Sequence, residues 1–84
     1  LNLFRNDIGD GGALAFASSE NFLNLELLYL GENKITDQGA VALIESQYFP
    51  RLKVLDLAMN PLGEATMMAA FKVNNKGKLQ IIYR

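Results

Sequence analysis

The apolar positions of this chain recur at a constant offset. Residues 25–35 read L-x-x-L-x-L-x-x-N-x-I. The same residue types return about one period of 27 residues later, one period earlier and two periods later, at Leu52, Leu55, Leu57, Asn60 and Leu62, at Leu1, Leu3, Asn6 and Ile8, and at Leu79 and Ile82. A fixed period of this size is the signature of a repeat architecture. We therefore expect a single repeat domain or a fragment of one, with repeats at about 1–24, 25–51 and 52–78 and a terminal strand at 79–84.

Each repeat has the pattern of a strand, a turn and a helix. Helical spacing of apolar residues, as in Ala40, Leu43 and Ile44, predicts helices at about 13–19, 37–47 and 64–74. Apolar alternation predicts strands at 27–30, 54–57 and 79–83, and part of a further strand in 1–8. Strands joined by the same turn and helix lie side by side and parallel. The predicted fold is an α/β solenoid, with about four parallel strands on one side and three helices on the other.

Two kinds of polar residue recur with the same period. Asn6, Asn33 and Asn60 follow the strands, where their amides can satisfy backbone groups that the turn leaves without ladder partners. Acidic residues stand at the start of each helix, where a carboxylate can accept hydrogen bonds from free amides. These predicted helix caps are Asp10, Asp37 and Glu64. The same column could in principle bind a divalent cation, but capping is the favoured interpretation because the acids repeat with the helices.

Glycines near the helix starts have an ordinary interpretation. Gly9, Gly12 and Gly39 permit positive φ or close approach of helix and sheet. A phosphate-binding loop would need a following Lys-Ser or Lys-Thr, which is missing after Gly12. In the third repeat Thr66 stands where the other repeats have glycine, so the start of that helix is the least certain.

Composition excludes several function classes. Eight basic and nine acidic residues give no basic excess for nucleic acid. No apolar stretch reaches the roughly 18 residues of a membrane helix. The chain has no cysteine and no histidine, so thiolate metal sites, disulfides and the commonest catalytic bases are missing, and the compartment stays open. We expect no enzyme activity, no metal and no cofactor. Because the sequence begins in the middle of a repeat, we expect a piece of a longer protein.

The period also predicts which side chains face away from the helices. One column is Leu27, Val54 and Ile81, which we expect to pack sideways on each other. Aromatic, methionine and charged residues occupy the other columns, and such residues are enriched in interface hot spots. The predicted partner-binding residues are Phe4, Arg5, Tyr29, Glu32, Asp56, Met59 and Tyr83.

Both halves of the repeat resemble one known family. The strand pattern followed by Asp-Gly-Gly-Ala-Leu-Ala at 10–15, or by Asp-Gln-Gly-Ala-Val-Ala-Leu at 37–43, resembles the ribonuclease-inhibitor type of leucine-rich repeat over essentially the whole chain. The resemblance implies a right-handed curved solenoid with strands on the concave side, which usually binds proteins through that side. A 27-residue period is slightly short for the type, and Thr66 departs from its glycine.

Three functions are compatible with these observations. The leading hypothesis is a protein-interaction module that binds a protein partner through its concave face. The second is a structural segment of a larger array, whose uncovered terminal strands would promote self-association. The third, regulation of a GTPase or another enzyme, rests on analogy alone.

Overall fold

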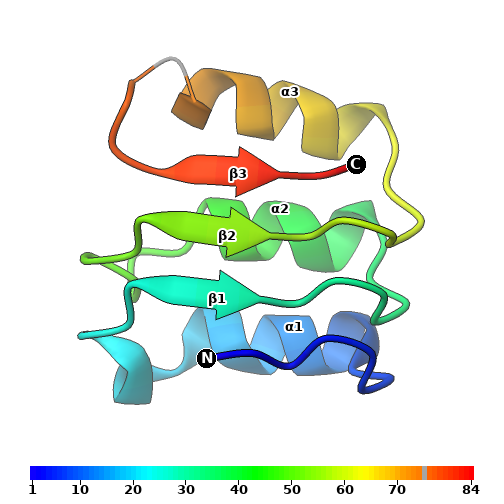
Figure 1. Cartoon of the computed structure of the whole chain (residues 1–84), viewed down its shortest axis with the longest axis horizontal. Helices are drawn as coiled ribbons and strands as arrows, with labels where there is room; N and C mark the ends of the chain where they lie inside the picture. Colours follow the sequence, from blue (N-terminus) through cyan, green and yellow to red (C-terminus); the bar gives the residue numbers. More distant parts are fainter. Residues whose placement is uncertain (75) are drawn as a thin grey trace.

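Helices and strands alternate along the chain. The structure is a computed structural model that describes residues 1–74 and 76–84. The elements in order are α1 (Gly9–Ser18), the 3-10 turn η1 (Glu20–Phe22), β1 (Leu27–Tyr29), α2 (Asp37–Ile44), β2 (Val54–Asp56), α3 (Glu64–Asn74) and β3 (Gln80–Ile82). Figure 1 shows the strands side by side in one layer and the helices in a second layer.

The strands form one parallel sheet in the order β1-β2-β3. Every crossover runs through a turn and a helix, which explains why neighbouring strands point the same way. The prediction of a mixed α/β fold with a short parallel sheet and three helices is therefore confirmed.

The predicted fourth strand is reduced to a single bridge. Asn2 bridges to Tyr29 in parallel orientation, and the amide of Leu3 donates to the carbonyl of Tyr29 at 2.8 Å. The extended segment ends quickly because the chain turns at Arg5, which has φ of 58°. The sheet in the described residues has three strands, not four.

The last repeat is one residue shorter than the period predicts. Leu28 pairs with Leu55, 27 residues later, whereas Leu55 pairs with Ile81, only 26 residues later. Ile81 is consequently buried at 4% exposure instead of joining Leu27 and Val54 on the open face, where Gln80 takes its place. The shift also turns Tyr83 toward the helices, where it packs against the core.

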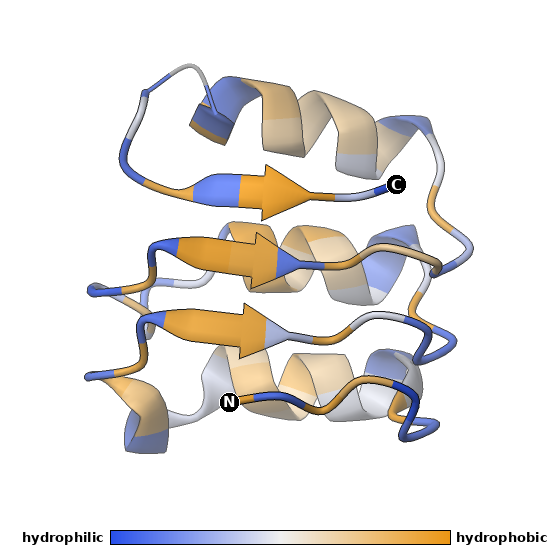
Figure 2. Cartoon of the chain, in the orientation of Figure 1, coloured by the Kyte–Doolittle hydropathy of each residue, from blue (hydrophilic) through white to orange (hydrophobic). Residues whose placement is uncertain are grey.

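The core lies between the strand layer and the helix layer. Figure 2 shows apolar residues along the strands and helices and polar residues in most of the connecting turns. Phe49 is buried and Phe22 is partly buried against the same cluster, with the rings of Phe16 and Phe22 5.0 Å apart. The buried apolar residues are Ala13, Leu28, Leu30, Ile35, Ala40, Leu43, Ile44, Phe49, Leu52, Leu55, Leu57, Ala70 and Ile81.

Two helix boundaries differ from the sequence-based expectation. α1 begins at Gly9 rather than near residue 13, because Gly9 turns the chain at φ of 68° and the helix follows directly. α2 ends at Ile44 rather than near residue 47. The third helix occupies the predicted residues.

The asparagine column connects neighbouring turns. The side-chain oxygen of Asn33 accepts from the amides of Asn6 at 2.6 Å and Ile8 at 3.3 Å. Its nitrogen donates to the carbonyls of Leu3 at 2.8 Å and Gly31 at 3.1 Å. Asn60 does the same one repeat later, where its oxygen accepts from the amides of Asn33 and Ile35. Each of these two amides therefore binds backbone of its own turn and of the preceding repeat.

Asparagine side chains also cover the outer edges of the sheet. At the β3 edge, Asn74 accepts from the amide of Ile81 at 2.9 Å and donates more weakly to its carbonyl at 3.4 Å. At the other edge, the amide of Phe4 donates to Asn2 at 3.0 Å and its carbonyl accepts from Asn6 at 3.2 Å. The expectation of uncovered terminal strands is therefore wrong for these backbone groups, which a second strand would need.

We predict that Asn33→Ala destabilises the protein far more than Asn6→Ala. Asn33 is fully buried, and its removal strands two amides and two carbonyls, so the free energy of unfolding should fall by about 3 kcal/mol or more. Asn6 is exposed and its side chain donates one bond, so Asn6→Ala should cost less than about 1 kcal/mol. Urea unfolding of both variants checks this difference, and equal losses would contradict the role assigned to Asn33.

Candidate functional site

Some polar side chains are committed to joining the repeats. The carboxylate of Asp10 accepts from the amide of Thr36 at 2.8 Å and from the amide of Gly39 at 3.1 Å. Asp37 accepts likewise from the amides of Gly63 at 2.8 Å and Thr66 at 3.2 Å. Each aspartate thus caps the helix of the following repeat and makes no capping bond to its own helix.

This geometry corrects the predicted helix caps. A first-turn side chain points back along its helix and sideways, so the neighbouring helix start is within reach of the carboxylate. Glu64 holds the corresponding place in α3 and is exposed. The acidic column therefore links α1 to α2 and α2 to α3.

The hydroxyl that completes each cap changes position between repeats. In the second repeat it belongs to Thr36, which donates to Asp10 at 2.5 Å, and glycine stands three residues later at Gly39. In the third repeat the order is reversed: glycine comes first at Gly63, and the hydroxyl of Thr66 donates to Asp37 at 2.5 Å. Thr66 is therefore a compensated exchange and starts its helix normally.

Glycine is required where no hydroxyl is present, because the carboxylate fills the space. A Cβ on Gly39 would lie 2.5 Å from Oδ1 of Asp10, and one on Gly63 would lie 2.9 Å from Oδ2 of Asp37. Both positions are thus set by the aspartate of the preceding repeat.

These hydrogen bonds shift the aspartate titrations. The Thr36 hydroxyl lowers the pKa of Asp10 from its ordinary value of 3.8, against an opposing effect of burial. The Thr66 hydroxyl and the amide of Gly63 lower the pKa of Asp37 in the same way. Both carboxylates are held in the charged form, so they serve as hydrogen-bond acceptors for the helices.

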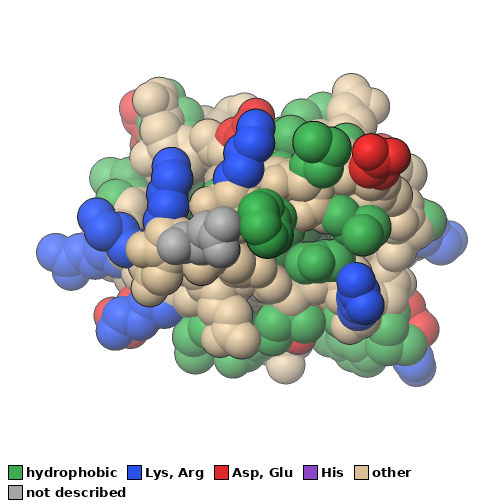
Figure 3. Space-filling view, turned by 90° about the horizontal axis from the view of Figure 1, so that it is seen from above, with side chains coloured by type: hydrophobic (Ala, Val, Ile, Leu, Met, Phe, Trp, Pro, Cys, Tyr) green, Lys and Arg blue, Asp and Glu red, His purple; other side chains and the backbone are tan. Residues whose placement is uncertain are grey.

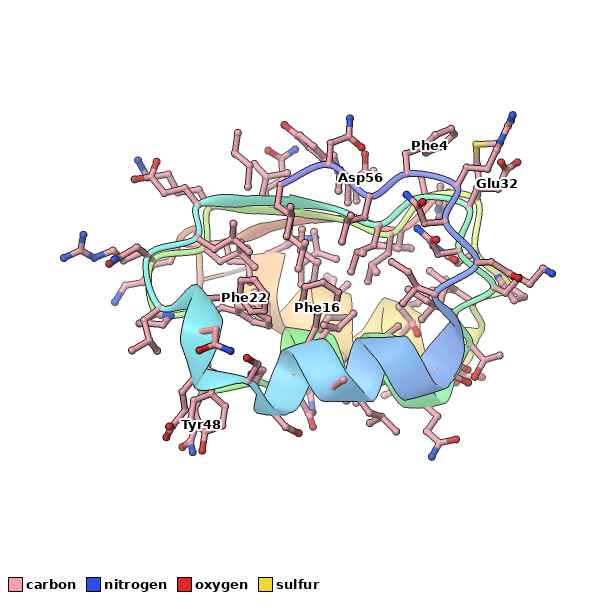
Figure 4. All side chains as sticks on the ribbon, turned by 90° about the horizontal axis from the view of Figure 1, so that it is seen from below. Phe4, Phe16, Phe22, Glu32, Tyr48 and Asp56 are labelled. Atoms are coloured by element: carbon pink, nitrogen blue, oxygen red, sulfur yellow. The ribbon has the colours of Figure 1, made fainter. Side chains whose placement is uncertain are left out.

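The open face of the sheet carries side chains that the scaffold does not use. Figure 4 shows Phe4, Glu32 and Asp56 on the side of the strands away from the helices, whereas Phe16 and Phe22 lie between the layers. Phe4 is 45% exposed, and its ring lies over Gly31, where an added Cβ would meet the ring at 2.9 Å. Glycine at this position lets the aromatic ring lie against the backbone.

A charged and apolar rim borders this face where the strands lead into the turns. Arg5 forms an ion pair with Glu32 and also lies over the Phe4 ring at 5.5 Å. Met59, the equivalent residue of the next repeat, is 62% exposed. Arg5, Glu32 and Met59 share a positive φ of 51° to 63°, a conformation that is uncommon for residues other than glycine.

The rim encloses a shallow hollow of about 380 Å³. It is lined by Arg5, Asp7, Glu32, Lys34, Met59 and Pro61. Lys34 bonds Asp7 at 2.9 Å, and this contact raises the pKa of Lys34. Its charged walls are thus paired across repeats, and the apolar part comes from the third repeat.

Six of the seven predicted binding residues border or lie on the open face. Tyr29 and Asp56 are half-buried neighbours in the sheet, and Asp56 accepts from the amide of Ala58 at 3.0 Å. Tyr83 is the exception, because the short last repeat turns it to the helix side. Ile82 takes its place beside Asp56, and sequence reasoning missed it.

A signal for this shift was present in the sequence. Polar residues at Lys78, Gln80 and Arg84 alternate with apolar residues at Leu79, Ile81 and Tyr83. That alternation alone places Ile81 and Tyr83 on the buried side, in conflict with the 27-residue period.

The chemistry available at the surface is that of contact rather than catalysis. Within residues 1–74 and 76–84, no three carboxylate, histidine or cysteine side chains gather as a metal site would need. Asp10 and Asp37, the nearest candidates, already accept from amides and hydroxyls. No helix among the described residues has both the length and the apolar character needed to cross a membrane.

We predict that exchanging threonine and glycine within the third cap is tolerated only as a pair. Thr66→Gly should lower the free energy of unfolding by about 2 kcal/mol, through the lost hydroxyl bond and the freedom of glycine. Gly63→Thr should also destabilise, because its Cβ meets Asp37. The double variant recreates the Thr36 and Gly39 arrangement, so a double-mutant cycle should recover most of the loss. Simple additivity in urea unfolding would contradict the exchange.

We predict that acid unfolding depends on the two aspartates. Their pKa values are lower in the folded than in the unfolded state, so the unfolded chain binds more protons as the pH falls. Their stabilising contribution is present at neutral pH and is lost as the pH falls below about 4. Urea midpoints from pH 7 to acid should therefore drop less steeply in Asp37→Asn than in wild type. Glu45→Gln serves as the control and should keep the wild-type slope, and an unchanged slope in Asp37→Asn would contradict the assignment.

Comparison with known families agrees with the repeat geometry. The sequence profile of the family described as Leucine Rich repeat matches residues 1–17 and 23–43. Curated proteins and solved structures gave no significant match. Its repeated strands and helices, its asparagine column and this family match together show that the chain is a leucine-rich repeat protein.

Proposed function

We propose that this protein is a non-enzymatic binding module that recognises a protein partner through the open face of its sheet. Leucine-rich repeats commonly mediate protein–protein interaction, which supports the general class. The observation that supports the particular face is the set of exposed or half-exposed aromatic and charged side chains on and beside it, which lie outside the buried core.

The composition of this face suits protein recognition. Phe4, Tyr29 and Met59 provide apolar area, and Arg5, Glu32 and Asp56 provide charge on either side. Aromatic residues, methionine and arginine are enriched in the centres of protein interfaces. Because Arg5 is already oriented by Glu32 and Phe4, it loses little conformational freedom on binding.

The subtype assignment belongs to the same proposal. The first turns of α1 and α2 retain the Asp-x-Gly-Ala sequence of the ribonuclease-inhibitor type, and the helices are 8 to 11 residues long. Helices of this length on the outer side would make the sheet the concave surface of a longer array. A purely structural segment is the second candidate, favoured by the carboxylates and amides that link the repeats.

We predict that the variant with Phe4, Tyr29 and Asp56 replaced by alanine loses its protein partners. Removing hot-spot side chains typically weakens binding by about tenfold or more each, so captured partners should disappear in a pull-down with the whole chain as bait. Circular dichroism verifies that the variant folds.

The matched control changes residues on the other side of the molecule. Glu45 and Tyr48 replaced by alanine remove an acid and an aromatic ring, and Tyr48 lies on the helix side (Figure 4). This control should retain every partner. If the open-face variant is folded and retains all partners as well, binding through this face is refuted.

A further inference from the structure

A second apolar surface lies at the end of the molecule formed by α3 and β3. Figure 3 looks onto this end, where hydrophobic side chains gather between charged ones. Met67, Met68 and Phe71 are 43%, 56% and 64% exposed. With Tyr83, Glu64 and Lys72 they line a hollow of about 320 Å³, here called the α3 face. Contiguous exposed apolar surface of this kind marks interaction sites.

The α3 face differs from the helix faces inside the stack. Met67 occupies the place of Ala13 and Ala40, which are both fully buried. Ala13 packs so closely on α2 that its Cβ lies 2.9 Å from where a Cβ on Gly39 would stand. A methionine cannot fit at that spacing, so the α3 face is unsuited to the helix packing seen between α1 and α2.

The neighbouring sheet edge offers no easy alternative. Asn74 occupies the amide and the carbonyl of Ile81 that point outward from β3. A strand that paired there would first have to displace this side chain. Association at this end is therefore directed to the helix rather than to the sheet.

The charges on α3 are arranged symmetrically. Glu64 and Lys72 each lie four residues from Met68, on opposite sides of it. We propose that α3 packs antiparallel against α3 of a second copy, about a two-fold axis near Met68. In this arrangement Glu64 of each copy faces Lys72 of the other, whereas a parallel pair would set like charges together.

The sizes of the apolar side chains fit the same axis. Residues equally distant from Met68 meet at the same height in an antiparallel pair, so Phe71 of one copy faces the small, exposed Ala65 of the other. A two-fold contact uses the same surface twice and closes on itself. The expected assembly is a dimer that leaves both open faces free, so it is independent of the proposed partner binding.

Charge reversal tests the dimer directly. Sedimentation equilibrium of the whole chain should show a monomer–dimer equilibrium, with a dissociation constant on the order of 100 µM because the contact is small. Glu64→Lys and Lys72→Glu alone each turn two attractive pairs into repulsive ones and should raise that constant about tenfold. The double variant restores opposite charges and should recover the wild-type constant.

The controls separate this contact from general aggregation. Glu20→Lys changes an exposed charge near the other end of the molecule and should leave the dimer unchanged, while Met68→Glu should give a monomer. Circular dichroism confirms that each variant is folded. The proposal is overturned if the wild type stays monomeric at ten times the expected constant, if it forms open-ended assemblies, or if the double charge reversal fails to restore the dimer.

Discussion

The structure depends on side chains that satisfy the backbone of a neighbouring repeat. Where a strand ends and a helix begins, amides and carbonyls leave their regular ladders, and buried polar groups without partners are costly. Asn33 and Asn60 supply partners at the strand ends, and Asp10 and Asp37 supply them at the helix starts. The amides reach back to the preceding repeat, whereas the carboxylates reach forward to the following one. Adjacent repeats are thereby joined in both directions by hydrogen bonds as well as by the apolar core.

This division of labour determines which surface remains free for function. The inward leucines, the asparagines and the aspartates are committed to the scaffold, and their identities follow from packing and turn geometry. Phe4, Tyr29, Asp56 and the rim pair of Arg5 and Glu32 vary between repeats because the scaffold does not specify them. The open face is thus the part of the fold where sequence can change without loss of structure, which is what a recognition surface requires.

Much of the fold was predictable from the sequence because packing repeats with it. The inward positions of Leu28 and Leu55, the asparagine column and the third helix all follow from one period. The period failed at β3, where a loop shorter by one residue moved Ile81 and Tyr83 to the buried side, and only the local alternation indicates that change. Contacts between repeats were also inaccessible. Nothing along the chain shows that Asp37 reaches Thr66, or that Asn74 covers the edge at Ile81, because these contacts depend on three-dimensional spacing.

Amide hydrogen exchange tests the central claim most directly. The amides of Asn33 and Ile35 lie in a turn outside any helix or strand, yet both donate to the side chain of Asn60 at 2.8 and 3.0 Å. If side chains join the repeats into one unit, these amides exchange as slowly as those of the core strands, and Asn60→Ala speeds both while the fold persists. Rapid exchange of Asn33 and Ile35 in the wild-type protein, at the rate of exposed turns, would contradict the account.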